Sequence, residues 1–158
     1  MPDSPAFLAE RLKTEGEKTL AFFSALTPAQ WQSVIYTEGA EWTVRSILAH
    51  FVTAEQGFLK LFASIRAGGP GASEDFDIDR YNASQQQKTK ELTPGELLAQ
   101  YQATRAEMVA VVAAFAEADL ERQGRHPFLG PTILAEMVKM VYRHNQIHLR
   151  DLRKLSLD

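Results

Sequence analysis

Two histidines near the C-terminal end of the sequence, His144 and His148, are four residues apart. On an α-helix this spacing places both side chains on one face, one above the other, so that two imidazoles can reach the same ion. Helical periodicity puts them on the apolar stripe that carries Val141 and Leu152, and this stripe must face other helices. The spacing therefore predicts two inward-facing histidines, which a shared divalent metal would explain.

A purely structural explanation is the alternative. An imidazole buried without a hydrogen-bond partner costs about 1–3 kcal/mol, so each ring could instead donate to a carbonyl or a carboxylate. A metal site needs a third protein ligand, and His50, on the flank of another apolar stripe, is the candidate. We expect His126, which lies among turn residues, at the surface.

The residue types exclude several other kinds of site. The sequence has no cysteine, so it has neither thiolate ligands nor a cysteine nucleophile. It also lacks an H-E-x-x-H motif, and no histidine has Glu three positions before it, as di-metal bundles of the ferritin type require. One mononuclear site with His50, His144 and His148 remains as the hypothesis.

Four long helices must position these histidines. Their expected ranges are 5–25, from Thr43 to the glycine-rich stretch that begins at residue 67, 94–118, and from Pro131 or Thr132 to 154. Thr27, Thr43 and Thr93 stand where helix N-caps are expected. We also expect a short helical turn through residues 31–35 and a loop with a short helix between residues 73 and 92.

The length and composition fit one domain over residues 1–158, because 45% of the residues are hydrophobic and 23% are charged. Helices of this number and length predict an all-α fold, a four-helix bundle with a long connection over residues 67–92 that could cross over between the second and third helices. The formal net charge of -3 argues against nucleic acid as a partner. Without a bilayer-length apolar run or a signal-peptide pattern, we expect no membrane association and a cytoplasmic location.

Two segments carry a resemblance to a known family. The stretch 42–51 (WTVRSILAHF) resembles the second-helix motif of the DinB-like superfamily of metal-binding four-helix bundles, and 144–152 (HNQIHLRDL) resembles its fourth-helix motif. The resemblance implies that His50, His144 and His148 bind a divalent metal.

A third segment, 77–82 (DIDRYN), is similar to a stretch near the metal pocket in some branches, which implies that Asp79 and Asn82 lie close to the site. The sequence departs from the family pattern at Gln146 and Asp151, where members often carry His and Gln. The ligand positions are unaffected, but contacts beyond them are expected to differ.

The resemblance also implies an activity. Some branches of the family are described as metal-dependent hydrolases and others as transferases that use low-molecular-weight thiols, so we expect a small-molecule substrate and, for the second class, a thiol. Zn, Ni, Fe and Mn are the candidate metals, and homodimers are common among the relatives. The alternative is a bundle without catalytic activity that binds a small ligand or a partner protein.

A metal-bound water would need a general base. Glu55 is the best-placed carboxylate on the second helix and is expected to face inward, although a structural hydrogen bond is the favoured interpretation. Asn145, beside His144, is also expected to face inward and to contact the site indirectly.

Overall fold

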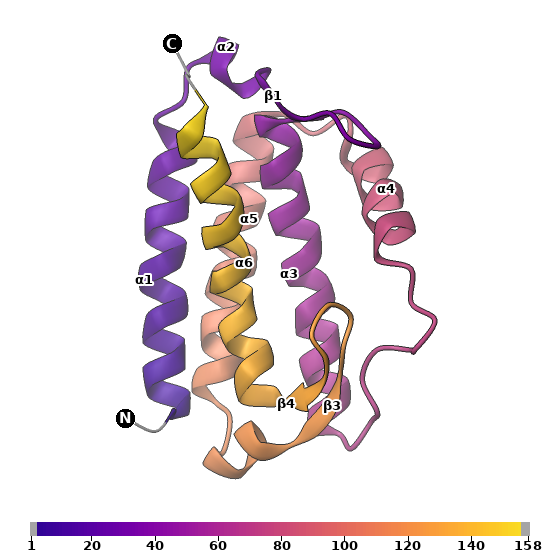
Figure 1. Cartoon of the computed structure of the whole chain (residues 1–158). Helices are drawn as coiled ribbons and strands as arrows, with labels where there is room; N and C mark the ends of the chain where they lie inside the picture. The colour runs from indigo at the N-terminus through magenta and orange to yellow at the C-terminus, as the bar shows by residue number, and fades with distance from the viewer. Residues whose placement is uncertain (1–2, 156–158) are drawn as a thin grey trace.

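The computed structural model, which describes residues 3–155, confirms the all-α four-helix bundle (Figure 1). Its long helices are α1 (Pro5–Ser24), α3 (Val44–Arg66), α5 (Pro94–Ala113) and α6 (Leu134–Lys154). Helix α1 packs against α5 and α6, and α3 packs against the same two helices. In Figure 1, α1 and α6 run in one direction and α3 and α5 run in the opposite direction.

Because α3 and α5 run parallel, the chain between them must return along the length of the bundle (Figure 1). The long connection is thus the crossover that the sequence suggested. It contains a helix of 12 residues, α4 (Ile78–Thr89), which packs against α3. Gln86 Nε2 donates to the carbonyl oxygen of Ser46 at 2.8 Å, and Arg45 Nε donates to the carbonyl oxygen of Leu92 at 2.9 Å.

Threonine caps fix the starts of three helices, as expected. The side chains of Thr27, Thr43 and Thr93 accept hydrogen bonds from backbone N–H groups in the first turns of α2 (Pro28–Trp31), α3 and α5. Each cap completes a reciprocal capping box, and such a cap is worth about 1 kcal/mol. The cap at Thr43 sets the start of the helix that carries His50.

The apolar interior consists of two clusters of buried residues. One cluster includes Leu12 and Met108, and the other includes Phe23 and Phe51. Along each long helix, buried polar residues stand between the parts that contribute to the two clusters: Thr19 on α1, Glu55 on α3, Thr104 and Arg105 on α5, and Asn145 on α6. The bundle therefore contains a polar layer between two apolar clusters.

Two small antiparallel hairpins differ from the expectation. Strands β1 (Val34–Tyr36) and β2 (Trp42–Thr43) pair where a helical turn through residues 31–35 was predicted, and helix α2 ends at Trp31. Strands β3 (Gln123–His126) and β4 (Gly130–Ile133) pair just before α6. These strands are short and carry little apolar alternation, so periodicity gave no signal for them.

Two predicted helix boundaries are wrong. Helix α5 ends at Ala113, not near residue 118, and a 3₁₀ helix, η1 (Glu117–Glu121), follows it. Helix α6 begins at Leu134, because Pro131 and Thr132 belong to β4 and pair with Arg125 and Gly124. Proline is common both at the first position of a helix and in edge strands, so Pro131 and Thr132 did not distinguish the two in the sequence.

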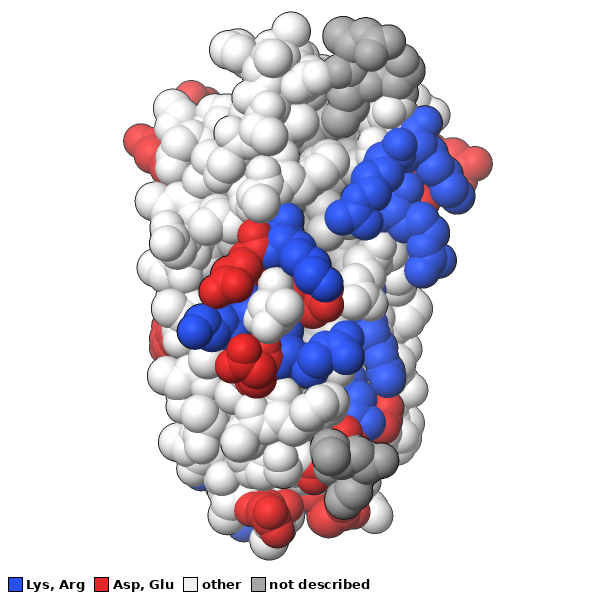
Figure 2. Space-filling view, turned by 90° about the vertical axis from the view of Figure 1, so that its left-hand side faces the viewer, with Lys and Arg blue, Asp and Glu red and all other residues white. Residues whose placement is uncertain are grey.

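The surface on the side of α1 carries both signs of charge. Figure 2 shows Lys and Arg side chains interleaved with Asp and Glu on this face. Ion pairs on these helices include Glu15 with Lys18 Nζ at 3.2 Å on α1 and Glu136 with Arg143 Nη1 at 3.3 Å on α6. Exposed pairs of this kind contribute little to stability. Within residues 3–155, no helix is long and apolar enough to cross a membrane.

Candidate metal centre

The structure brings the three predicted histidines together on the wall of one cavity. His50 comes from α3, and His144 and His148 come from successive turns of α6. All three line a cavity of about 1360 Å³ whose wall also includes residues of α4 and of both hairpins. One ring nitrogen of each histidine lies within 4.8 Å of the others, and His50 Nε2 is 2.8 Å from His144 Nε2.

A tyrosine and an aspartate orient His148. Tyr36 Oη lies 2.6 Å from Asp151 Oδ2 and 2.9 Å from His148 Nδ1. Burial and the bond to Asp151 raise the pKa of Tyr36, so the hydroxyl keeps its single proton and donates it to the carboxylate. His148 Nδ1 must then donate to Tyr36 Oη, which leaves the lone pair on Nε2 free for an ion.

All three imidazoles are held in the neutral form. Burial and the nearby His148 lower the pKa of His50 to about 3. Burial also lowers the pKa of His144 well below its ordinary value, and lowers that of His148 against the opposing effect of Asp151. A neutral imidazole is the form that binds metals, so the donor set fits a divalent ion such as zinc, nickel or iron.

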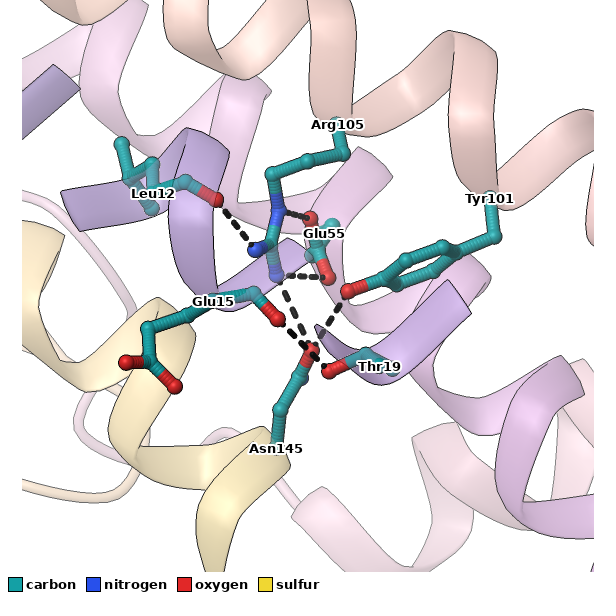
Figure 3. Close-up of polar contacts among 7 residues, drawn as sticks. All are labelled: Leu12, Glu15, Thr19, Glu55, Tyr101, Arg105 and Asn145. Carbon is teal, nitrogen blue, oxygen red and sulfur yellow. Dashed lines mark hydrogen bonds and ion pairs between the residues drawn. The ribbon is translucent and has the colours of Figure 1, made fainter. Parts of the chain in front are cut away.

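Glu55, the candidate general base, lies in the polar layer and is not part of the cavity wall (Figure 3). Its two carboxylate oxygens accept from Arg105 Nε and Nη2, both at 2.8 Å. The pair is buried: the Glu55 side chain is 1% exposed and that of Arg105 is 5% exposed. A carboxylate engaged through both oxygens is in no position to take a proton from a water in the cavity, so we assign Glu55 a structural role.

Asn145 belongs to the same layer (Figure 3). Its Oδ1 accepts from Tyr101 Oη at 2.7 Å and from Arg105 Nη2 at 3.0 Å, while Arg105 Nη1 donates to the carbonyl oxygen of Leu12 at 2.9 Å. The polar layer therefore joins all four long helices, and through Asn145 it fixes the turn of α6 on which His144 lies. Asn145 faces inward, as expected, but within the described residues its hydrogen bonds go to Tyr101 and Arg105 and not to a converging histidine.

Asp79 and Asn82 lie on α4 and line the same cavity as the three histidines. Neither belongs to the group of converging metal-binding side chains. The crossover thus places them where they can contact a bound molecule.

His126 was expected at the surface, and that expectation is wrong. Its exposed fraction is 2%, and it lines the cavity from the end of β3. The turn residues around it fold over the ring, a tertiary effect that turn composition alone does not reveal.

Sequence reasoning also missed Tyr36, Arg105 and the role of Asp151. The sequence could have indicated Arg105, because it lies on the same helical stripe as Tyr101, Met108 and Val112. A charged side chain on a buried stripe is expected to have a buried partner of opposite charge. Tyr36 had no such signal, since it lies more than a hundred residues from His148 in the chain.

A family model described as the DinB superfamily matches residues 11–152. The chain belongs to the DinB superfamily. No functionally curated protein matches the sequence. This membership agrees with the fold and with the positions of the histidine motifs.

Solved structures of three relatives share the fold. YfiT from Bacillus subtilis, described as a probable metal-dependent hydrolase with an unusual four-helix bundle topology, has a TM-score of 0.72 at 18% identity, with 96% of this chain and 83% of that one covered. The colibactin self-resistance protein ClbS, in complex with double-stranded DNA, has a TM-score of 0.74 at 15% identity, with 98% of each chain covered. A mycothiol-dependent maleylpyruvate isomerase has a TM-score of 0.73 at 17% identity, with 94% of this chain and 59% of that one covered.

Replacing Arg105 tests the polar layer. We expect Arg105→Met to lower the free energy of unfolding by about 3–5 kcal/mol, because it leaves the Glu55 carboxylate buried without a partner. The double variant Arg105→Met/Glu55→Leu should recover most of this loss, since no buried charge remains. Urea unfolding of both variants measures the difference, and a single-variant loss below about 1 kcal/mol would contradict the assignment.

Replacing Tyr36 tests the orientation of His148. We expect Tyr36→Phe to weaken metal binding about 10- to 100-fold, the usual effect of removing a partner of a metal-binding histidine. Tyr81→Phe is the matched control, because Tyr81 lines the same cavity and its hydroxyl bonds to the carbonyl oxygen of Thr53, not to an imidazole. Competition titration with a zinc chelator gives both affinities, and equal values for the two variants would refute the orientation.

The lowered pKa of His50 predicts how stability depends on pH in metal-free protein. The unfolded chain binds a proton at this histidine below about pH 6.5, whereas the folded chain, with a pKa of about 3, does not. Its contribution to stability is therefore complete above pH 6.5 and is lost as the pH falls, by about 1.4 kcal/mol per pH unit. Urea unfolding from pH 6.5 to 4 should show a shallower dependence for His50→Gln, and an unchanged slope would count against a neutral buried His50.

Proposed function

We propose that the protein is a divalent-metal-dependent enzyme that acts on a small molecule, with His50, His144 and His148 as the ligands. The observation that carries the proposal is the convergence of three neutral imidazoles, with ring nitrogens within 4.8 Å, on the wall of a cavity large enough for a substrate. Three protein ligands leave a coordination position open, which is typical of catalytic sites and unlike closed structural ones.

A metal bound there would supply an activated water or thiolate, or would polarise a substrate carbonyl. The residues of the chain would provide the rest. The Tyr36–Asp151 pair would hold His148 in the binding tautomer, and Asp79 and Asn82 would contact the substrate from α4. Hydrolysis and transfer to a low-molecular-weight thiol are the two reactions that this arrangement supports.

Two relatives are described by a metal or a thiol requirement. The Bacillus subtilis relative is described as a probable metal-dependent hydrolase, and the isomerase is described as mycothiol-dependent. Sequence identities below 20% carry the fold and no more, so the reaction of this chain rests on its own cavity.

We propose a small molecule as the partner, and not nucleic acid. The formal net charge is -3, and the side of the bundle formed by α1 mixes acidic and basic side chains (Figure 2). The ClbS structure contains DNA, which makes DNA binding the competing partner to measure. A cytoplasmic location and homodimer formation stay predictions from the sequence.

Metal content and turnover together test the proposed function. Protein purified without a histidine tag should hold about one divalent ion per chain by elemental analysis, as a single three-histidine site requires. His148→Ala should lose the ion, whereas His126→Asn, which alters the fourth histidine, should keep it. Metal-loaded protein should turn over members of ester, amide or thiol-conjugate panels, and a chelator should abolish this activity.

The possible results separate the hypotheses. Turnover without added thiol indicates a hydrolase, and turnover only with a thiol indicates a transferase. Stoichiometric metal without turnover across the panels would favour the ligand-binding alternative. A protein that binds no divalent metal would overturn the proposal.

A further inference from the structure

His126 is a buried cavity residue that the proposed metal site does not use. It ends strand β3, and its ring centroid lies 5.2 Å from that of Phe58 on α3. The backbone N–H groups of Phe128 and Leu129, in the turn between β3 and β4, both donate to His126 Nδ1 at 3.0 Å. The turn therefore holds the ring through one nitrogen only.

These two bonds fix the tautomer. A ring nitrogen that accepts two N–H donors carries no proton, so the proton of the neutral imidazole is on Nε2. Burial lowers the pKa of His126 to about 4, which keeps the ring neutral at pH 7. Nε2–H is thus a buried donor, and it has no acceptor within the described part of the chain.

Backbone hydrogen bonds fix the strand that ends at His126. Arg125 N donates to the carbonyl oxygen of Pro70 at 2.9 Å, and Ala72 N donates to that of Arg125 at 2.8 Å, so the crossover clamps β3 just before His126. His126 and the three converging histidines line the same cavity. The donor therefore belongs to a built wall and not to a loose surface turn.

His126 does not fit the role of a fourth metal ligand. Binding a metal through Nε2 would require the proton to move to Nδ1, where it would face the N–H groups of Phe128 and Leu129. A donor with a fixed direction suits an acceptor oxygen on a bound molecule, because an unpaired buried donor costs about 1–3 kcal/mol that such an oxygen would recover.

The rest of the cavity wall indicates which class of molecule would carry this acceptor oxygen. Its wall is rich in apolar side chains, and several remain partly exposed, with Phe128 at 67% and Ile147 at 45%. The apolar wall includes Phe58, Phe76, Ile78, Phe128, Met140 and Ile147. Its ionisable side chains other than histidine and tyrosine are Glu38, Lys60 and Asp79, so the side chains alone carry no excess of positive charge.

We infer that His126 Nε2–H binds the carbonyl oxygen of a substrate with an apolar aryl or alkyl body that occupies this cavity. The inference rests on the proposed function for the cavity as the substrate site. It assigns His126 to substrate binding and leaves metal binding to the other three histidines.

The test uses metal-free protein, so that its result does not depend on the metal or on turnover. The probe is acedan, an apolar naphthalene ketone whose fluorescence shifts to longer wavelength when its carbonyl accepts a hydrogen bond. Its ethyl analogue, which lacks the carbonyl, is the matched probe. We expect the protein to bind acedan with red-shifted emission relative to the same probe in an aprotic solvent.

Two substitutions separate the two ring nitrogens. His126→Asn can keep an acceptor near the position of Nδ1 for the turn, but it removes the donor, so acedan should bind about fivefold to tenfold more weakly, as expected for one lost hydrogen bond. The ethyl analogue should bind to this variant as it does to the unmodified protein. His126→Gln can keep a donor near the position of Nε2 and should retain part of the red shift.

A measurement without substitutions guards against variants that fail to fold. Nitrogen NMR of the imidazoles should show His126 protonated at Nε2, and acedan should move the Nε2–H proton resonance downfield. Equal acedan affinity in His126→Asn, an Nδ1-protonated ring, or no acedan binding would overturn the inference. None of these results alters the metal content of the protein, so the proposed function would stand or fall separately.

Discussion

The interior of this bundle depends on satisfying charged and polar groups that the apolar clusters on either side cannot solvate. Arg105 supplies five N–H donors, and Glu55, Asn145 and the Leu12 carbonyl oxygen accept from them on three other helices. An arginine so placed cannot tolerate a shift of any one helix, because the shift would leave a buried charge unpaired. Gly16 makes the arrangement possible, since a Cβ there would lie 2.7 Å from Arg105 Cγ. The polar layer thus sets the register of the four long helices (Figure 3).

This register is what brings the histidines together. Asn145, in the polar layer, precedes His148 by less than one turn and follows His144 directly, so the contacts of Asn145 set the rotation of α6 about its axis. On α3, Glu55 lies little more than one turn beyond His50. Two histidines on α6 can meet a third on α3 only if the two helices are aligned along the bundle axis, and the polar layer fixes this alignment. The three converging histidines and the Arg105–Glu55 ion pair therefore depend on the same helix alignment.

The sequence predicts the parts of this arrangement that local rules govern. Three threonine caps, the stripe of apolar residues on each long helix and the inward direction of His144 and His148 all follow from spacing within one helix. Partners from distant segments do not follow. The bond between Tyr36 and His148 joins a short strand to the last helix, and the strand-favouring run Val34–Tyr36 is too short to predict a strand or to indicate its partner. The burial of His126 was misjudged, and Arg105 was missed as the partner of Glu55, because the contacts that decide each role lie on another element.

The bundle helices and the connections between them contribute different residues to the cavity, because α3 and α5 run parallel. Such a topology needs a crossover, and the crossover supplies α4 as one wall of the cavity and the segment that clamps β3 (Figure 1). The bundle helices hold the three converging histidines, whereas the cavity residues that would meet a substrate, Asp79, Asn82, His126 and Phe128, come from α4 and the β3–β4 hairpin. Helix packing constrains the first set strongly, while the connections can vary in sequence without disturbing the polar layer. These segments could therefore change in sequence and reshape the cavity while the three converging histidines stay in place.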